Sequence, residues 1–498
     1  MKLLKDILYG ARISEVIGST HIAIESVVAD SRQVKPFSCF VAIPGTTVDG
    51  HEHIPGAVRS GAAAIVCERM PTEEERTDQV IYIQVENTRE ALGHLAANFH
   101  DNPTERLKVI AITGTNGKTT VATLLHRLAR MFDRKAGLVS TVENRINDRV
   151  VPATHTTPDP VGLQALFAKM LDAGCTHCFM EASSHALDQH RLSGSQLTGG
   201  VFTNITHDHL DYHGDFNAYI SAKKSLFDKL PGVAFALTNA DARHGDTMVQ
   251  NTRARVVTYG THQVADHKAR IIENGLGGLQ LHLDGQDLYT RLIGEFNASN
   301  LTAVYAVARE LGWNAMDTLT HLSLLDAPPG RMQQVQAGKG DVHAIVDYAH
   351  TPDALAKVLE TLRTVRSAGP ATGANGEARI LCVVGCGGDR DRTKRPVMAR
   401  TAADLADLVI LTSDNPRSED PSAILGEMRE GLDPIQMRKV TYNTDRAEAI
   451  RSACMQAQAG DVILVAGKGH EKYQEINGER HPFDDVAMLA ESLNTFTR

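Results

Sequence analysis

The sequence has few cysteines, and it contains no long apolar run and no long basic run. Its seven cysteines are scattered over 498 residues and odd in number, which is typical of a chain kept in a reducing cytoplasm. No apolar stretch approaches the roughly 20 residues that cross a bilayer. The apolar part of the first residues, MKLLKDILYGARI, is too short for a signal peptide. The sequence therefore predicts a cytoplasmic protein that is not inserted in a membrane.

Charge and cysteine spacing argue against two further classes of protein, nucleic-acid-binding proteins and zinc-finger proteins. The net charge is −9, and without a basic run nucleic acid is a poor candidate partner. Cys175 and Cys178 form a CxxC, and Cys382 and Cys386 form a second, looser pair. Neither pair has a partner at zinc-finger spacing, so we interpret these thiols as core or loop residues.

Length and composition indicate an ordinary globular protein of about three domains. Hydrophobic residues make up 42% and charged residues 22% of the chain. Asn102-Pro103 and a tight turn at 328–332 mark two boundaries, and the predicted domains are 1–102, 103–335 and 336–498. In the first, Asp30-Ser31-Arg32 lies between two expected strands, and alone this tripeptide indicates a turn more than a binding site.

One stretch, residues 108–120, reads KVIAITGTNGKTT and organises the prediction for the second domain. Its apolar run predicts a buried parallel strand, and the residues that follow have helical spacing. A strand, a glycine loop, GK[ST] and a helix form a phosphate cradle, in which Lys118 reaches the outer phosphates and the Thr119 hydroxyl binds Mg²⁺. The usual pattern has its first glycine where Ile112 stands, so an ordinary strand-to-helix turn remains the alternative.

Two later strand ends supply further metal-ligand candidates. Glu181 ends one expected strand, and the histidine-rich loop containing His209 follows the next. Because ligands of an open parallel sheet gather at the carboxyl ends of its strands, both side chains are expected beside Thr119. Mg²⁺ prefers oxygen ligands, so Glu181 suits it better than His209 does. The alternative for the whole loop is a set of solvated polar residues.

The third domain alternates expected strands and helices, which predicts a parallel, doubly wound sheet. Polar residues follow four of its strands, around Asp347, Arg390, Asp414 and Glu471. Guanidinium and carboxylate groups in one crevice suit a zwitterionic ligand such as an amino acid. A surface cluster of ion pairs is the alternative.

In order along the chain, these motifs resemble the Mur ligase family, ATP-dependent enzymes that add amino acids to the peptidoglycan precursor. The matching stretches are TGTNGKTT, Glu181-x-Ser-Ser-His, HDHLDYH at 207–213, Glu295-Phe-Asn, Gly330-Arg331 and Asp347-Tyr-Ala-His. Within the family, the tetrapeptide at 414–417, Asp-Asn-Pro-Arg, resembles the signature for meso-2,6-diaminopimelate. Diaminopimelate differs from lysine by a second carboxylate, which an arginine can bind with two parallel hydrogen bonds.

The resemblance implies an α/β fold of three domains, with a central P-loop ATPase-like parallel sheet and a C-terminal Rossmann-like domain. It implies a monomer that adds diaminopimelate to UDP-N-acetylmuramoyl-L-alanyl-D-glutamate through an acyl phosphate, with ATP and Mg²⁺. Lys223, in a Tyr-x-x-Ala-Lys pattern, is expected to be carbamylated and to serve a metal site. His155 departs from the family pattern, because a related enzyme has asparagine there.

The resemblance also assigns residues to each ligand. The implied catalytic residues are Lys118, Lys223, His209, Asp347 and His350. The implied ATP site is Gly114, Thr115, Asn116, Gly117, Lys118, Thr119, Thr120, Asn297 and Arg331, and the implied metal site is Thr119, Glu181, His209 and carbamylated Lys223. The UDP-muramoyl-dipeptide is assigned to Ser31, Thr46, Thr47, Val48, Thr156, Thr157, Ser183, Gln189 and Arg191. Diaminopimelate is assigned to Arg390, Asp414, Asn415, Pro416, Arg417, Gly467 and Glu471.

Other functions remain open on the sequence. A lysine-adding, D-alanyl-D-alanine-adding or folyl-polyglutamate ligase would share the phosphate loop, although Arg417 and the N-terminal domain argue against these. A nucleotide-switched binding module without ligase activity is the alternative from a different class, and it would not need the pair of Arg390 and Arg417.

Overall fold

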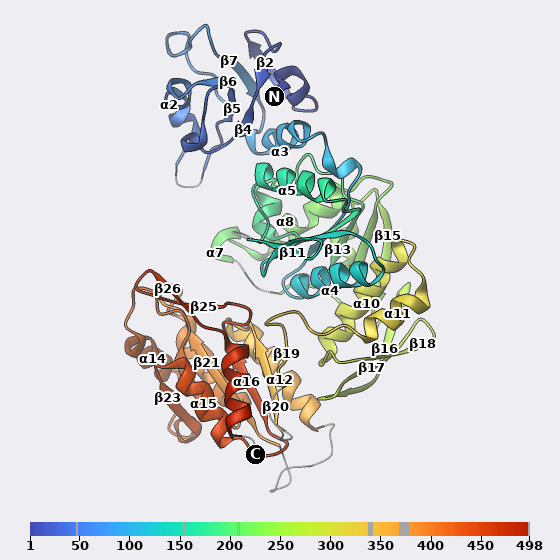
Figure 1. The fold of residues 1–498 in the computed structure, drawn as a ribbon, viewed down its shortest axis with the longest axis vertical. Helices are drawn as coiled ribbons and strands as arrows, with labels where there is room; N and C mark the ends of the chain where they lie inside the picture. The colour runs from blue at the N-terminus through green and yellow to red at the C-terminus, as the bar shows by residue number, and fades with distance from the viewer. Residues whose placement is uncertain are drawn as a thin grey trace. The chain divides into compact units, whose positions relative to one another are not determined.

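The computed structural model describes residues 1–45, 48–152, 156–206, 208, 210–336, 342–367 and 378–496 (Figure 1). The chain forms two compact units. One comprises Met1–His267 with Ala303–Trp313, and the other comprises Lys268–Thr302 with Asn314–Arg498.

The N-terminal part of the first unit is a five-stranded sheet in the order β2-β7-β6-β5-β4, parallel except for β2. Alternate strand residues face opposite layers: Val41 and Val66 pack with α3, and Phe40 and Ile65 pack with α2. The elements are β1 (Lys2–Leu3), α1 (Leu4–Ile7), β2 (Ile13–Ile17), β3 (Ala23–Ile24), β4 (Ser26–Val28), β5 (Ser38–Val41), α2 (Ile54–Arg59), β6 (Ala62–Cys67), β7 (Ile81–Val85) and α3 (Thr88–Phe99).

The central part of the first unit is a larger sheet whose strands run in the order β11-β10-β9-β12-β8-β13-β14-β15. The strands from β9 to β15 in this order are parallel, with β8 near the middle. The elements are β8 (Lys108–Thr113), α4 (Lys118–Met131), β9 (Ala136–Val139), β10 (Asn144–Ile146), β11 (Arg149–Val151), α5 (Pro160–Asp172), β12 (His177–Glu181), α6 (Ser184–Asp188), β13 (Gly199–Phe202), α7 (Leu210–His213), α8 (Phe216–Asp228), β14 (Phe235–Asn239), α9 (Gly245–Val249) and β15 (Arg255–Gly260).

The second unit contains the antiparallel strands β16, β17 and β18 and a six-stranded sheet in the order β19-β20-β24-β21-β22-β23. The six-stranded sheet is parallel except for β19. Its elements and those around it are β16 (His267–Gly275), β17 (Gly278–Leu283), β18 (Gln286–Thr290), α10 (Glu295–Glu310), α11 (Ala315–Ser323), β19 (Gln333–Gln334), β20 (His343–Asp347), α12 (Pro352–Ser367), β21 (Ile380–Cys386), α13 (Lys394–Leu405), β22 (Leu408–Ser413), α14 (Pro421–Arg429), β23 (Val440–Asn443), α15 (Arg446–Gln456), β24 (Val462–Ala466), β25 (Tyr473–Ile476), β26 (Glu479–Pro482) and α16 (Asp485–Phe496).

The six-stranded sheet is doubly wound, as predicted. Cys382 and Leu464 face one core layer with α12, α13 and α14, whereas Val383 and Val465 face the other with α15 and α16. A parallel sheet covered on both faces needs strands that are apolar throughout, which β21 and β24 are.

Cysteine burial agrees with the interpretation of core thiols. All seven cysteines are buried and unbonded to one another. Burial raises the pKa of the Cys178 thiol well above its usual value, so the thiolate is disfavoured at neutral pH. Among the described residues, no helix is both long enough and apolar enough to cross a membrane.

Candidate active site

The predicted phosphate loop connects β8 to α4 at the middle of the central sheet. Gly114 and Gly117 have φ angles of 150° and 88°, which glycine adopts without strain. A Cβ atom on Gly114 would lie 1.9 Å from the Thr203 hydroxyl, so the loop passes too close to β13 for any side chain there. The sequence therefore folds here into the strand, glycine loop and helix that a phosphate cradle requires.

Lys118 extends over the loop that it follows. Its ammonium donates hydrogen bonds to the carbonyl oxygens of Gly114, at 2.8 Å, and Thr115, at 2.9 Å. Thr119 and Thr120, in the first turn of α4, are both buried. The cation is therefore held at the mouth of the loop, where the partial positive charge of the helix N-terminus also favours an anion.

Lys223 reaches the same loop from α8. The residue is 1% exposed, and its ammonium donates to the Gly114 carbonyl oxygen at 2.9 Å. Burial, with a smaller contribution from Lys118, lowers the pKa of Lys223 well below its usual value. Lys224 instead forms an ion pair with Asp228 at 2.6 Å. The structure thus distinguishes the two adjacent lysines: Lys223 contacts the phosphate loop and Lys224 does not.

Glu181 lies on the strand next to the loop, because β12 pairs with β8 and places Glu181 opposite Ile112. Its carboxylate is buried, and it accepts hydrogen bonds from the Thr141 backbone N–H, at 2.8 Å, and from the Thr141 hydroxyl, at 3.3 Å. This support fixes the carboxylate at the carboxyl edge of the sheet, which is the position expected of a metal ligand.

Four residues assigned to the nucleotide-sugar peptide form one connected group. The guanidinium of Arg191 donates to the Thr157 carbonyl oxygen, at 2.6 Å, and to Gln189 Oε1, at 2.7 Å. The Ser183 N–H donates to the Thr157 hydroxyl at 3.4 Å. Partial burial lowers the pKa of Arg191. Thr156 joins the Glu181 network, since its hydroxyl lies 3.0 Å from the Thr141 hydroxyl.

The remaining residues of that assignment are less closely connected. Ser31 begins a short 3₁₀ helix after β4, and Val48 follows β5 with 51% of its surface exposed. Both follow parallel strands at the carboxyl edge of the N-terminal sheet. Thr46, Thr47, His155 and His209 lie outside the described residues, so their assignments stay predictions. Among the described residues, no three His, Cys, Asp or Glu side chains gather as a metal site.

In the second unit, Asp347 ends β20 and organises the turn containing Arg331. Its carboxylate accepts from the backbone N–H groups of Met332, at 2.7 Å, and Ala349, at 2.8 Å. Burial raises the pKa of Asp347, although the Arg331 guanidinium and these N–H groups act in the opposite direction. The guanidinium of Arg331 lies over the Tyr348 ring, 5.0 Å from its centre.

His350 and Asn297 have different surroundings. His350 is exposed, and its Nδ1 lies 2.9 Å from the Tyr348 carbonyl oxygen, an arrangement that leaves Nε2 as an acceptor. Asn297 is buried in α10, where its amide donates to the Ile293 carbonyl oxygen and accepts from Asn300. The Asn297 side chain therefore stabilises the start of its own helix in this structure.

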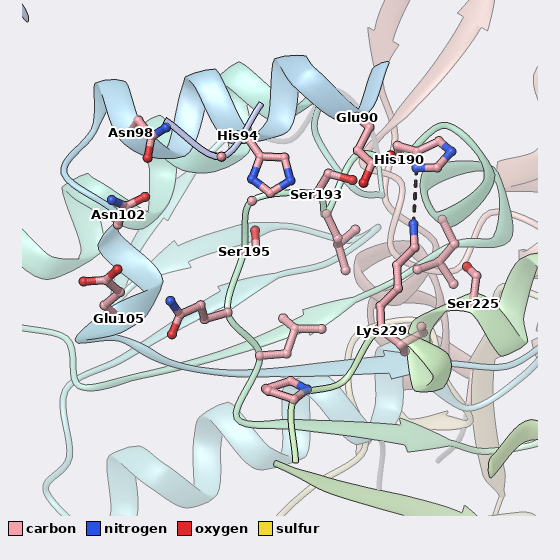
Figure 2. A pocket seen from close by; sticks show the side chains of 18 of the residues that line it. Glu90, His94, Asn98, Asn102, Glu105, His190, Ser193, Ser195, Ser225 and Lys229 are labelled. Atoms are coloured by element: carbon pink, nitrogen blue, oxygen red, sulfur yellow. Dashed lines mark hydrogen bonds between the residues drawn. The ribbon is translucent and has the colours of Figure 1, made fainter. Parts of the chain in front are cut away.

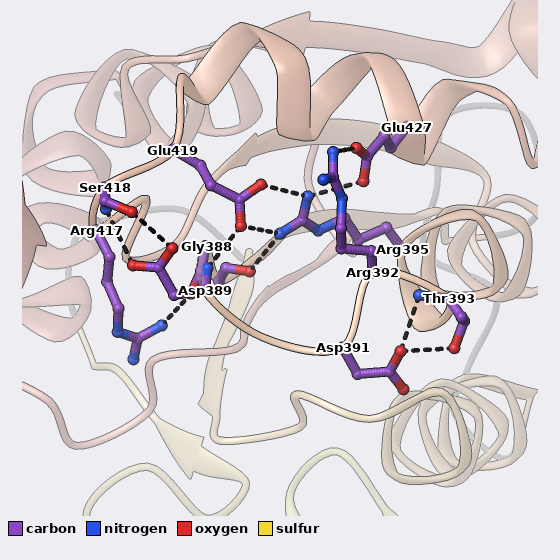
Figure 3. Close-up of polar contacts among 11 residues, drawn as sticks. Gly388, Asp389, Asp391, Arg392, Thr393, Arg395, Arg417, Ser418, Glu419 and Glu427 are labelled. Atoms are coloured by element: carbon purple, nitrogen blue, oxygen red, sulfur yellow. Dashed lines mark hydrogen bonds and ion pairs between the residues drawn. The ribbon is translucent and has the colours of Figure 1, made fainter.

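The predicted amino-acid crevice is assembled at the carboxyl ends of β24, β21 and β22, which are adjacent in the sheet. Asn415 Nδ2 donates to Glu471 Oε2 at 2.9 Å, which joins two of the strand ends. Arg417 Nη1 donates to the Gly388 carbonyl oxygen at 2.7 Å, which joins the third (Figure 3). Gly467, with a φ of 114°, lies so close to Asp414 that a Cβ would be 2.7 Å from its carboxylate.

Arg390 and Arg417 both lie next to Gly387. A Cβ placed on that glycine would lie 3.7 Å from Arg390 Cγ and 3.0 Å from Arg417 Nη1. Pro416 contributes its carbonyl oxygen, which accepts from the Glu419 N–H at 3.0 Å. The structure thus brings the predicted residues of the crevice to one place.

Ion pairs occur within the crevice, where Arg417 lies 3.5 Å from Glu475 and Lys468 lies 3.1 Å from Glu471, and a separate cluster of ion pairs lies beside it. Arg395 is fully buried, and its guanidinium binds Glu419, at 2.8 Å, and Glu427, at 2.7 Å, as Figure 3 shows. Arg392 also pairs with Glu427. This cluster ties α13 to α14 and the loop before it, while Arg417 points away from it toward Gly388.

Models of Mur ligase domains match three successive segments of the chain. Residues 23–100 match "Mur ligase family, catalytic domain", residues 112–308 match "Mur ligase middle domain", and residues 330–469 match "Mur ligase, glutamate ligase domain". The UDP-N-acetylmuramoyl-L-alanyl-D-glutamate–2,6-diaminopimelate ligase of Cytophaga hutchinsonii is 51% identical, over 99% of both chains. The ligase of the same name from Bacteroides thetaiotaomicron is 48% identical, over 99% of this chain and 100% of that one.

The chain belongs to the Mur ligase family. It is therefore an ATP-dependent ligase that forms amide bonds. A solved structure of a ligase of the same name is 34% identical, with a TM-score of 0.69 and coverage of 95% of each chain. The MurF ligase of Thermotoga maritima in complex with ADP, at 18% identity and a TM-score of 0.58, covers 95% of this chain and 98% of its own, and it supports the fold alone.

The comparisons confirm the predicted family and the three-domain α/β fold of this Mur ligase. The domain boundaries and the role of each site residue stay predictions. Two residues near the phosphate loop were missed on the sequence. Thr141 holds Glu181, and Asn204 accepts from the Asn116 N–H at 3.0 Å through Oδ1 and from the Thr115 N–H at 2.8 Å through its carbonyl. Asn204 lies two residues after the end of β13, so its place near a strand end was the available signal.

The first unit of this Mur ligase also contains a cavity of about 460 Å³, lined by α3, the segment 187–197 and the end of α8 (Figure 2). Glu105 of the lining precedes β8, Leu197 precedes β13, and Pro231 precedes β14. The cavity therefore lies at the amino ends of strands whose carboxyl ends carry the phosphate loop. Its lining mixes Glu90 and Glu105 with Lys229 and two histidines, which favours no single class of ligand.

Proposed function

We propose that this chain catalyses the ATP-dependent addition of meso-2,6-diaminopimelate to UDP-N-acetylmuramoyl-L-alanyl-D-glutamate. The main support is the crevice containing Arg417, in a chain about half identical over its whole length to ligases named for this reaction. An arginine fork matches the second carboxylate of diaminopimelate, which lysine lacks. A cytoplasmic location suits the buried, reduced cysteines and the soluble nucleotide substrates.

The phosphate loop is proposed to bind ATP through residues 114–120. The backbone N–H groups at the start of α4 and the ammonium of Lys118 would face the phosphates, in place of the carbonyl contacts that Lys118 makes here. In the first step, the D-glutamyl carboxylate attacks the γ-phosphorus and ADP leaves, which produces an acyl phosphate. Lys118 lowers the barrier by stabilising negative charge on the transferred group.

The residues present fit a magnesium ion. Glu181 offers a carboxylate held by Thr141, and Thr119 offers a hydroxyl at the helix N-terminus, and both are oxygen ligands of the kind that Mg²⁺ prefers. His209 is retained as a proposed ligand. A bound Mg²⁺ would neutralise phosphate charge.

Lys223 is proposed to be carbamylated. Its buried amine has a lowered pKa, so the neutral form that reacts with CO₂ is accessible. The new N–C bond converts the amine into a carbamate and releases a proton. The product would carry oxygen ligands on the wall of the phosphate loop, where the amine now contacts Gly114.

In the second step, the amine of diaminopimelate attacks the acyl carbon, and a tetrahedral intermediate collapses to the amide as phosphate leaves. Asp414 and Glu471 are proposed to bind ammonium groups of the amino acid, and Arg390 and Arg417 its carboxylates. Asp347, His350, Asn297 and Arg331 are proposed to act on the nucleotide, while the connected group around Arg191 holds the nucleotide-sugar peptide.

The test is phosphate release from ATP with each substrate omitted in turn, followed by mass spectrometry of the product. We expect release only when ATP, the UDP-muramoyl-dipeptide and diaminopimelate are all present, with one amide formed for each phosphate. Equal turnover with lysine would indicate a lysine-adding ligase instead. Nucleotide binding without any amino-acid-dependent phosphate release would indicate a binding module.

A further inference from the structure

Lys468 is a fully buried cation beside the amino-acid crevice. It follows β24, and its side chain is 0% exposed. Removing an ammonium from water is costly unless hydrogen bonds and an opposite charge replace the lost hydration. Here Nζ donates to Asn415 Oδ1, at 2.9 Å, and to Glu471 Oε2, at 3.1 Å. The ring of Tyr473 lies 5.5 Å from the ammonium.

Both hydrogen-bond partners of Lys468 are proposed ligand-binding residues, and they also bind each other. Asn415 Nδ2 donates to Glu471 Oε2 at 2.9 Å, so Lys468, Asn415 and Glu471 form a closed triangle. The Glu475 N–H donates to Asn415 Oδ1 at 2.9 Å as well. With two donors at Oδ1, the Asn415 amide has one satisfactory orientation, in which Nδ2 is the donor that faces Glu471.

We infer that Lys468 is the positioning residue of the amino-acid site: its buried ammonium fixes the orientation of the Asn415 amide and of the Glu471 carboxylate. The inference rests on the proposed function only in assigning Asn415 and Glu471 to the amino acid. Because its side chain has no exposed surface, Lys468 acts through these two residues and does not touch the ligand. A correctly oriented Glu471 carboxylate can accept from an ammonium group of the amino acid, and a fixed Asn415 amide offers a donor.

The experiment compares Lys468→Met with Lys472→Met. Both variants lose one lysine charge, but Lys472 has 81% of its side chain exposed and lies outside the triangle. We expect Lys468→Met to raise the Michaelis constant for diaminopimelate on the order of tenfold, the equivalent of about 1.4 kcal/mol, without changing those for ATP and the UDP-muramoyl-dipeptide. Lys472→Met should leave all three constants unchanged. Lys468→Arg keeps a cation and should recover part of the loss.

A merely structural role would give a different pattern. Lower thermal stability of Lys468→Met with an unchanged Michaelis constant for diaminopimelate, or equal losses for all three substrates, would overturn the inference. If the wild-type enzyme uses another amino acid instead of diaminopimelate, the proposed substrate is wrong, and the same comparison is made with the amino acid that it uses.

A crystal structure of the wild-type protein with the amino acid bound supplies a test that needs no variant. We expect Nζ of Lys468 within hydrogen-bond distance of Asn415 and Glu471, and the ligand against those two residues. A Lys468 ammonium that contacts the ligand directly, or a ligand bound away from Asn415 and Glu471, would contradict the inference.

Discussion

Replacing Arg417 by alanine should specifically weaken the use of diaminopimelate. The Arg417 side chain is 21% exposed, its Nη1 donates to the Gly388 carbonyl oxygen, and its Nε lies 3.5 Å from a Glu475 carboxylate oxygen. These contacts engage Nη1 and Nε, so the N–H groups of Nη2 are the donors proposed to meet the distal carboxylate. A hydrogen bond between charged groups contributes about 1.5–3 kcal/mol.

Losing that contact should raise the Michaelis constant for diaminopimelate by roughly 10-fold to 100-fold, since about 1.4 kcal/mol corresponds to a factor of ten. The loop itself should persist in Arg417→Ala. Its main chain is held by the Arg417 N–H to the Glu475 carbonyl oxygen, at 3.0 Å, and by the Asn477 N–H to the Arg417 carbonyl oxygen, at 2.7 Å. The left-handed φ of 52° costs alanine about what it costs arginine. Arg417→Lys should recover only part of the affinity, because an ammonium lacks the planar fork.

The measurement is steady-state ligation with diaminopimelate and with lysine as competing amino acids. Arg438→Ala is the matched control, because Arg438 is exposed and lies in the short 3₁₀ helix Gln436–Lys439 before β23, outside the crevice. Binding of the UDP-muramoyl-dipeptide, measured by calorimetry, should be the same in all variants. If Arg417→Ala uses diaminopimelate as well as the wild type does and still rejects lysine, then other residues determine the specificity.

Four further predictions concern the phosphate loop and the stability of the fold. Lys118→Ala should abolish phosphate release, and near-normal turnover would refute the phosphate-loop assignment. Lys223→Ala should be inactive and partly rescued by acetate, whereas Lys224→Ala should stay active; the reverse result would move the carbamate to the other lysine. Asp485 forms a fully buried ion pair with Arg446 at 2.7 Å. Asp485→Ala leaves the Arg446 guanidinium buried without its carboxylate, so the free energy of unfolding in urea should fall by about 3–5 kcal/mol. Gly194→Ala places a Cβ 2.4 Å from the Gly93 carbonyl oxygen at a φ of 76°, and it should lower the same free energy by about 1–3 kcal/mol; an unchanged unfolding curve would contradict either stability argument.

The sequence was informative wherever a local pattern determined the structure. The apolar run before Gly114 predicted β8, and alternating strands and helices predicted the doubly wound C-terminal sheet. Such patterns work because a strand buried on both faces must be apolar throughout, and because a glycine loop before a helix has few conformations.

Contacts between distant residues were harder to predict. Nothing in a Lys-Lys pair shows which ammonium is buried, since that depends on how α8 packs against a loop more than 100 residues earlier in the chain. Lys468 stood within a polar stretch that was noted, yet its burial depends on a loop about 50 residues before it. In the stretch after β21, the sequence singled out Arg390, which lies beside the crevice, but it did not predict the ion pair between Arg392 and Glu427.

The hairpin of β25 and β26 holds the loop at 414–417 mostly through main-chain atoms. The N–H and carbonyl groups of Glu475 and the N–H of Asn477 supply three hydrogen bonds to that loop. Two contacts depend on residue identity: the Gln474 side chain donates to the Asp414 carbonyl oxygen, and the Glu475 carboxylate pairs with Arg417. Over evolutionary time, most side chains of this hairpin can therefore change while its main-chain hydrogen bonds to the loop at 414–417 are preserved. Inserting or deleting one residue would instead shift the register of every main-chain contact, so we expect related enzymes to vary here in sequence but not in length.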